Sequence, residues 1–238
     1  MNLAVDIGNS AAKIGVFRKD ELIYKYEGIK PENLQEIVTK FAITGAILST
    51  VTDTPEVFLD QISALDRVIL LTHQTPLPLR INYDTPETLG RDRIAASCGA
   101  QALFPNENCL VIDCGSCITY DVLSVDGTYQ GGAITPGLTM RFQSLNTFTS
   151  NLPLIQPEDE LTTIGKSTKE CIQSGVVNGI LSEMEGYIHR LSDIFQPLKL
   201  VMCGGDTYFF ENKVKARIFA APELVLRGLN RILQHNAS

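Results

Sequence analysis

The stretch LAVDIGNS at residues 3–10 returns in altered form as LVIDCGSC at residues 110–117. Each copy is a short apolar run that ends in Asp-x-Gly and small polar residues, and a second apolar run with a polar turn follows it. This pattern predicts a strand, a tight turn and a second strand. Because the hairpin occurs twice, we expect two related halves of the chain that face each other across a shared ligand.

The turns of both copies have the composition of a phosphate-binding loop. Glycine lets the backbone approach an anion closely, and successive N–H groups donate to its oxygens together with Asn9, Ser10 and Ser116. A carboxylate beside a phosphate repels it unless a cation lies between them, so Asp6 and Asp113 also indicate metal ions. A plain hairpin turn remains the alternative for either copy alone, and the repetition disfavours it.

The composition is that of an ordinary globular protein with an acidic balance. The chain has 238 residues, of which 44% are hydrophobic, and a net charge of −7. We expect two domains, over residues 1–106 and 107–238. The acidic charge and the lack of a Lys/Arg stripe disfavour nucleic-acid and anionic-membrane partners. No basic or apolar leader precedes the first strand and no apolar run is long enough to cross a bilayer, so we expect a cytoplasmic protein.

Two further motifs indicate other chemistry and are rejected. Cys114 and Cys117 have the Cys-x-x-Cys spacing, but no second pair follows and the three histidines are scattered, so the thiols are expected to be structural. The sequence GKST at residues 165–168 ends like a P-loop. However, Glu160 stands where the first glycine is required, and no strand precedes the motif.

Strands alternate with helices along the chain, which predicts an α/β fold. In the first half, strands are expected at residues 2–7, within 12–26, at 46–48 and at 68–71, and helices at 31–41, 55–65 and up to about 104, with a long loop at 72–90. In the second half we expect a glycine-rich strand end at 131–137, a helix from about 138, a polar connection at 146–166, one or two helices at 167–195, a strand at 200–203 and a helix at 223–234. The two glycines after residue 203 are where adenosine is expected to pack.

The segment GRDR at residues 90–93 places Asp92 between two arginines at the expected start of a helix. Positive charge and the helix dipole both favour an ionised carboxylate there. Such a carboxylate is a candidate base for a hydroxyl nucleophile, and a neighbouring guanidinium is suited to a substrate carboxylate. A helix cap with surface ion pairs is the structural alternative.

Together these motifs, in this order and spacing over almost the whole chain, resemble those of the bacterial type III pantothenate kinases. The resemblance implies a duplicated actin-like (ribonuclease H-like) α/β fold of two domains and a homodimer. It also implies ATP-dependent phosphorylation of pantothenate to 4′-phosphopantothenate, the first step of coenzyme A biosynthesis.

The resemblance also assigns roles to individual residues. Asp92 matches the catalytic base, Asp113 the monovalent-cation ligand for K⁺ or NH₄⁺, and Ser116 a second ATP-phosphate contact. The first ATP-phosphate motif is matched by Asp6, Ile7, Gly8, Asn9, Ser10, Ala11, Ala12 and Lys13, with Asp6 holding Mg²⁺ through water. The pantothenate positions are matched by Tyr83, Gly90, Arg91, Asp92, Arg93 and Thr168, with Arg93 expected to bind the substrate carboxylate and Thr168 expected near a partner subunit.

The sequence departs from the family pattern at three of these loop positions. Ser10 and Ser116 stand where threonine is usual, and serine keeps the hydroxyl that phosphate binding needs. Cys117 stands where alanine is usual. On the residues alone two alternatives stay open, another kinase or phosphatase of the same superfamily and a non-catalytic nucleotide-binding regulator.

Overall fold

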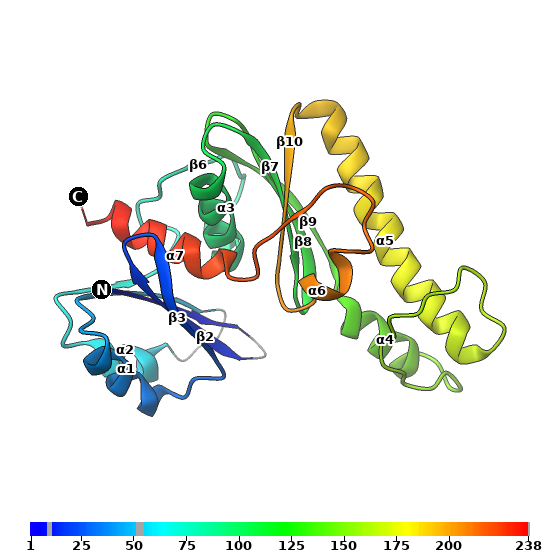
Figure 1. Cartoon of the computed structure of the whole chain (residues 1–238), viewed down its shortest axis with the longest axis horizontal. Helices are drawn as coiled ribbons and strands as arrows, with labels where there is room; N and C mark the ends of the chain where they lie inside the picture. Colours follow the sequence, from blue (N-terminus) through cyan, green and yellow to red (C-terminus); the bar gives the residue numbers. More distant parts are fainter. Residues whose placement is uncertain (9–10, 51–54, 238) are drawn as a thin grey trace. The chain divides into compact units, whose positions relative to one another are not determined.

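The computed structural model describes residues 1–8, 11–50 and 55–237 (Figure 1). The chain divides into two compact units, which are described separately. Unit 1 comprises Met1–Asn106, Leu123–Gly131 and Glu223–Ser238, and unit 2 comprises Glu107–Val122 and Gly132–Pro222. The expected domain division after residue 106 stays a prediction, and the last helix of the chain packs within unit 1.

Unit 1 is built on a five-stranded sheet in the order β3-β2-β1-β4-β5. Its strands are β1 (Asn2–Ile7), β2 (Ala12–Arg18), β3 (Glu21–Glu27), β4 (Gly45–Thr50) and β5 (Arg67–Leu70). The first three strands form an antiparallel meander, whereas β4 and β5 continue in parallel from β1. The predicted hairpin at the start of the chain is therefore confirmed, and its first strand lies at the centre of the sheet.

The helices of unit 1 lie on both faces of this sheet. Its helical segments are η1 (Pro31–Asn33), α1 (Leu34–Lys40), α2 (Glu56–Ile62), η2 (Pro86–Thr88), α3 (Arg91–Leu103) and α7 (Leu224–His235). Leu3, Val5 and Ile7 point from β1 into a buried cluster with α1 and α2. Because side chains alternate along a strand, Ala4 and Asp6 point to the other face, where α7 contacts β1, β4 and α3.

Unit 2 repeats the strand order of unit 1. The second sheet has the order β11-β10-β7-β8-β9-β6, so β9-β8-β7-β10-β11 matches β3-β2-β1-β4-β5. Its strands are β6 (Arg80–Ile81), β7 (Asn108–Cys114), β8 (Cys117–Leu123), β9 (Thr128–Pro136), β10 (Leu198–Cys203) and β11 (Phe219–Ala220). As with β1 and β4, β7 pairs in parallel with β10. The duplication predicted from the repeated motif is thus present in the sheet topology.

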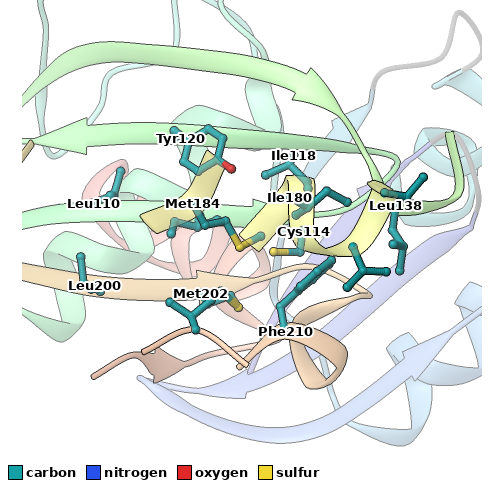
Figure 2. Close-up of a cluster of buried hydrophobic side chains, with 14 of the residues drawn as sticks. Leu110, Cys114, Ile118, Tyr120, Leu138, Ile180, Met184, Leu200, Met202 and Phe210 are labelled. Atoms are coloured by element: carbon teal, nitrogen blue, oxygen red, sulfur yellow. The ribbon is translucent and has the colours of Figure 1, made fainter. Parts of the chain in front are cut away.

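The core of unit 2 lies between this sheet and the long helix α5 (Figure 2). The helices of the unit are α4 (Leu138–Thr147), α5 (Thr168–Ile194) and α6 (Thr207–Phe210). Tyr120 from β8, Met202 from β10 and Ile180 and Met184 from α5 are buried in one cluster. Such a cluster fixes β7 and β8, and with them the turn that joins them.

The structure corrects the predicted elements in two places and resolves the number of helices in a third. The loop expected at residues 72–90 contains the short strand β6 and the turn of 3-10 helix η2, because Arg80 and Ile81 pair with the start of β9. One continuous helix, α5, covers the region expected to hold one or two, and its glycines do not interrupt it. The segments α6 and β11 were not predicted. No helix in the described part of the chain is long and apolar enough to cross a membrane.

Glycines in the contact between α3 and α7 provide a test of this packing. A Cβ at Gly228 would overlap the carbonyl oxygen of Ala95, so Gly228→Ala should force the helices apart and lower the free energy of unfolding by about 2 kcal/mol or more. Gly179, in α5, has nothing within 4 Å of such a Cβ. Gly179→Ala should therefore raise the stability by up to about 1 kcal/mol through helix propensity. Urea unfolding monitored by circular dichroism measures both variants, and equal effects would contradict the close helix contact.

Candidate active site

In unit 1 the turn between β1 and β2 brings Asp6 opposite Lys13 in the antiparallel register. The turn is closed by a hydrogen bond from Gly8 N to the carbonyl oxygen of Ala11 (3.3 Å). Asp6 lies on a central strand and is partly buried. The predicted phosphate contacts Asn9 and Ser10 lie outside the described residues.

Asp92 lies in the first turn of α3, as the sequence predicts. Its Oδ1 accepts a hydrogen bond from the backbone N–H of Arg93 (2.9 Å), and the positive end of the helix dipole favours its negative charge. Gly90 precedes the helix, and a Cβ there would lie 2.6 Å from Asp92 Oδ1. Glycine at position 90 therefore leaves the space that the carboxylate occupies.

Arg91 and Arg93 have different surroundings in the structure. Arg91 Nη1 donates to the carbonyl oxygen of Thr50 at the end of β4 (3.4 Å), which fixes the start of α3 beside the sheet. The side chain of Arg93 is buried, with a relative exposure of only 6%. The two arginines that flank Asp92 are thus held by the protein interior and do not form a flexible surface pair.

The first turn and the start of α3, far apart in the sequence, come together at Asp6 and Asp92. Burial, together with the negative charge of Asp92, raises the pKa of Asp6 to about 6, and Lys13 only partly offsets this effect. A buried carboxylate close to a second one is a place where a cation is electrostatically favoured. Asp6 and Asp92, which are both predicted site residues, are therefore close to each other within unit 1.

Tyr83 lies elsewhere in unit 1, on the segment that follows β6. Its ring packs at a tilt against the buried ring of Tyr129, with the centroids 6.1 Å apart. Asn82 N donates to the carbonyl oxygen of Tyr129 (2.9 Å), so β9 holds the backbone beside Tyr83. The side chain of Tyr83 is partly exposed.

In unit 2 the equivalent turn places Asp113 at the end of β7 and Ser116 in the bend. Asp113 pairs in register with Cys203 of β10. The residue after Cys203, Gly204, has a φ of 92°, and a side chain there would overlap Asp113 Oδ1. Ser116 is exposed.

The glycine-rich end of β9 packs directly against this turn. Gly137 N donates to the carbonyl oxygen of Ser116 (3.1 Å), and a Cβ at Gly137 would overlap the carbonyl oxygens of Gly115 and Ser116. The motif predicted at residues 131–137 therefore supports the backbone of the second loop.

The two cysteines of the Cys-x-x-Cys pair differ in burial, Cys114 being buried and Cys117 partly exposed. Cys114 points into the apolar core beside Ile180 and Phe210 (Figure 2), and burial raises the pKa of its thiol. Cys114 and Cys117 are both free thiols. Among the residues that the structure describes, no group of three or more His, Cys, Asp or Glu side chains is arranged to hold a metal ion.

The GKST segment forms the N-terminal cap of α5. Ser167 Oγ accepts from Glu170 N (3.3 Å), while Glu170 Oε2 accepts from Lys166 N (2.7 Å), so the two side chains satisfy N–H groups at the start of the helix. This local role explains the composition that imitates a P-loop. Thr168, the predicted substrate contact, is the exposed first residue of the helix.

Ser49 is a site neighbour that the sequence reasoning missed. It pairs in register with Asp6 on the parallel strand β4 and is fully buried. Within the described part of the chain its hydroxyl has no hydrogen-bond partner. In the sequence, Ser49 is marked only by its place at the end of an apolar strand. That it lies beside Asp6 can be inferred only once the order of the strands is known.

Comparisons with known proteins agree on one family. The family model described as type III pantothenate kinase matches residues 2–190. Proteins named type III pantothenate kinase from Phocaeicola vulgatus and Bacteroides fragilis are 41% and 42% identical to this chain; the alignments cover 99% of this chain and 99% and 98% of those proteins.

Solved structures share the fold at lower identity. A Campylobacter jejuni protein described as a conserved Baf family transcriptional activator is 24% identical, with a TM-score of 0.66 over 99% of this chain and 98% of that one. A glucokinase from an Antarctic psychrotroph is 12% identical, with a TM-score of 0.53 over 98% of each chain. With the duplicated sheet topology, these likenesses identify the expected actin-like α/β fold.

The raised pKa of Asp6 predicts how stability depends on pH. The folded protein holds this proton more tightly than the unfolded chain, so stability should fall as the pH rises from about 4 to about 6. In metal-free buffer, Asp6→Asn should remove this cost and be more stable than the wild type at pH 7 by up to about 3 kcal/mol. The two proteins should differ little from this cause at pH 4.

Chemical denaturation at pH 4 and pH 7 measures the effect. Asp66→Asn is the matched control, because Asp66 is exposed. If Asp6→Asn differed in stability from the wild type by the same amount at both pH values, the predicted cost of ionising Asp6 would be contradicted.

Proposed function

The chain belongs to the type III pantothenate kinase family and phosphorylates pantothenate in coenzyme A biosynthesis, and from this premise we propose the roles of its site residues. The enzyme uses ATP and a divalent metal ion. The observation that carries the proposal is the proximity of Asp92, at the start of α3, to Asp6, at the end of β1.

Asp92 is proposed as the general base. Its carboxylate accepts the proton of the primary hydroxyl of pantothenate, and the hydroxyl oxygen then attacks the γ-phosphoryl group in line. The N–H of Arg93 holds the carboxylate in one orientation before the proton moves. Since phosphoryl transfer depends chiefly on positioning and charge, a fixed base contributes by alignment as well as by proton transfer.

Pantothenate is proposed to bind through the residues around this base. Tyr83 offers a ring and hydroxyl, and the backbone at Gly90 approaches the carboxylate of Asp92 closely. Arg93 is proposed to bind the substrate carboxylate, and Arg91 is proposed to contribute to pantothenate binding next to it. A guanidinium shielded from water binds a carboxylate with paired hydrogen bonds more strongly than an exposed one.

The residues of the first turn fit a magnesium ion. Asp6 carries a negative charge that Asp92 opposes and Lys13 only partly offsets, so a divalent cation relieves an existing cost. We propose that Asp6 holds Mg²⁺ through water, while the segment from Ile7 to Lys13 binds the ATP phosphates. Magnesium commonly takes few protein ligands and keeps several waters, and when bound it would neutralise phosphate charge.

The second turn is proposed to hold a monovalent cation at Asp113 and an ATP phosphate at Ser116. Asp113 stands at the end of its strand, with the thiol-bearing Cys203 as its neighbour in register.

A homodimer and a cytoplasmic location complete the proposal. Unit 2 exposes several large apolar side chains around α4 and the loop that precedes α5. They are Ile134, Met140, Phe148, Leu154 and Ile164, with relative exposures of 60%, 42%, 85%, 52% and 79%. Such side chains are typical of the core of a protein interface. Thr168 lies four residues after Ile164, which agrees with a substrate contact near a partner subunit. The cytoplasmic location agrees with the use of ATP.

Asp92→Asn tests the role of the base. The amide keeps the shape but takes up no proton, so kcat should fall by about two orders of magnitude or more, while binding of pantothenate remains measurable. A coupled assay of ADP release gives kcat, and calorimetry gives pantothenate affinity. Asp84→Asn, at an exposed position between β6 and η2, is the control. An unchanged kcat in Asp92→Asn would exclude Asp92 as the base.

The dimer is tested by replacing two of the exposed apolar residues. Phe148→Ser with Ile164→Ser should shift the protein from dimer to monomer and raise the KM for pantothenate, since Thr168 would lose its place beside the partner. Light scattering after size exclusion measures the mass. Ile194→Ser removes an apolar side chain of similar exposure (70%) at the other end of α5 and should leave the dimer intact. A double variant of unchanged mass would argue against this interface.

A further inference from the structure

A shielded polar network in unit 2 centres on the carboxylate of Glu183, which lies on α5. Its Oε1 accepts hydrogen bonds from Tyr120 Oη (2.9 Å) and Thr135 Oγ1 (2.8 Å), and its Oε2 accepts from Arg141 Nη2 (2.7 Å). These donors come from β8, β9 and α4, so one carboxylate connects four elements. The side chains of Arg141 and Glu183 are only 21% and 24% exposed, which makes the pair stronger than an exposed one.

The groups of the network hold fixed protonation states. Burial, followed by the charge and hydrogen bond of Glu183, raises the pKa of Tyr120, which therefore remains a donor. For Glu183, burial is the largest single influence and acts upward. The combined hydrogen bonds of Arg141, Thr135 and Tyr120 nevertheless keep its pKa below the usual value, so it remains an acceptor. The stacking of Tyr120 on Tyr187, with centroids 4.3 Å apart, further fixes the network.

Arg141 extends this network to the end of β9. Its Nε donates to the carbonyl oxygen of Pro136 (2.8 Å), and its Nη2 also approaches Thr135 Oγ1 (3.3 Å). One planar guanidinium therefore holds two consecutive residues through different nitrogen atoms. Lysine, with a single ammonium group, does not reproduce this geometry.

The segment that Arg141 holds is the one that supports the turn containing Ser116. Directly after Pro136, Gly137 N donates to the carbonyl oxygen of Ser116 (3.1 Å) and packs on the turn without a side chain between them. On the other side of the turn, Thr135 Oγ1 lies 3.4 Å from the carbonyl oxygen of Ile118. A continuous series of contacts thus joins Glu183 to the backbone on both sides of the loop.

We propose that Arg141, oriented by Glu183, is a positioning residue for the turn at Ser116 and thereby sets the affinity of the enzyme for the phosphates of ATP. The inference rests on the proposed role of this turn as a phosphate contact. Arg141 acts through Pro136 and Gly137 and does not itself touch the nucleotide. Loss of this orientation is expected to weaken ATP binding more than pantothenate binding.

The test compares steady-state kinetics of the full-length enzyme for both substrates. Arg141→Gln should raise the KM for MgATP about tenfold, the lower end of the effect of losing an orienting partner at a binding site, and leave the KM for pantothenate within about twofold. Arg141→Lys keeps the charge and should recover part of the loss, and it remains measurable if Arg141→Gln does not fold. Glu183→Gln should give a smaller shift in the same direction.

Lys213→Met is the matched control for lost packing and charge. Lys213 is 20% exposed and pairs with Asp159 at 2.9 Å, also in unit 2, but it contacts the backbone of α6 and not the end of β9. The Lys213→Met variant should lower the melting temperature without changing the KM for MgATP. An equal change in that KM for Lys213→Met and Arg141→Gln, or a parallel rise in both substrate KM values for Arg141→Gln, would overturn the proposal.

Ser116→Ala separates this inference from the proposed phosphate role. If Arg141 acts through the turn, the combined Ser116→Ala and Arg141→Gln variant should raise the KM for MgATP less than the product of the single effects. Where Ser116→Ala raises the KM on its own, a multiplicative effect would refute positioning through this turn. If Ser116→Ala alone leaves the KM unchanged while Arg141→Gln raises it, the phosphate role of the hydroxyl fails, whereas positioning of the turn backbone stands.

Discussion

The repulsion between Asp6 and Asp92 is the constraint on which unit 1 depends. Burial and the negative charge of Asp92 make the carboxylate of Asp6 harder to ionise, and Lys13 offsets this only in part. The fold accepts this cost because both groups sit on rigid elements, one on a central strand and the other in the first turn of a helix. The contact of α3 with α7, close enough to exclude side chains at Gly99 and Gly228, holds that helix in place. The same uncompensated charge is what a divalent cation and a substrate proton require.

The duplicated topology places a second carboxylate in an equivalent position with different surroundings. Asp113 lies on β7 as Asp6 lies on β1, yet its neighbour in register is the thiol-bearing Cys203, whereas the neighbour of Asp6 on β4 is the hydroxyl-bearing Ser49. Beside burial, Asp113 and Asp206 raise the pKa of the Cys114 thiol at the second turn, whereas Asp92 raises that of the Asp6 carboxylate at the first. One backbone design therefore yields two electrostatic environments.

Local patterns predicted the parts of the fold that depend on neighbouring residues. Alternating apolar runs gave the strands of both hairpins, and the charges around Asp92 indicated a helix start. The short strand β6 and the position of α7 depend on pairing with distant segments, so no local signal marks them. The segment before α5 shows the converse problem. Its glycine, lysine and hydroxyl residues imitate a phosphate loop, but Ser167 and Glu170 satisfy the helix end locally. Ser49 and Arg141 were missed for the same reason as β6, since their roles arise only when strands and helices are assembled.

The network around Glu183 illustrates why such residues matter to a phosphate site. Removing a charged pair from water costs free energy, and well-packed apolar side chains in the same place are often at least as stabilising. Apolar side chains, however, are non-directional and do not fix a backbone carbonyl. Arg141 does fix one, because Nε meets Pro136 O while Nη2 meets Glu183. The contact of the glycine-rich end of β9 with Ser116 is through backbone atoms. A fixed backbone in this turn, which the proposed phosphate role requires, therefore depends on adjacent side chains, and the directional guanidinium is one of them.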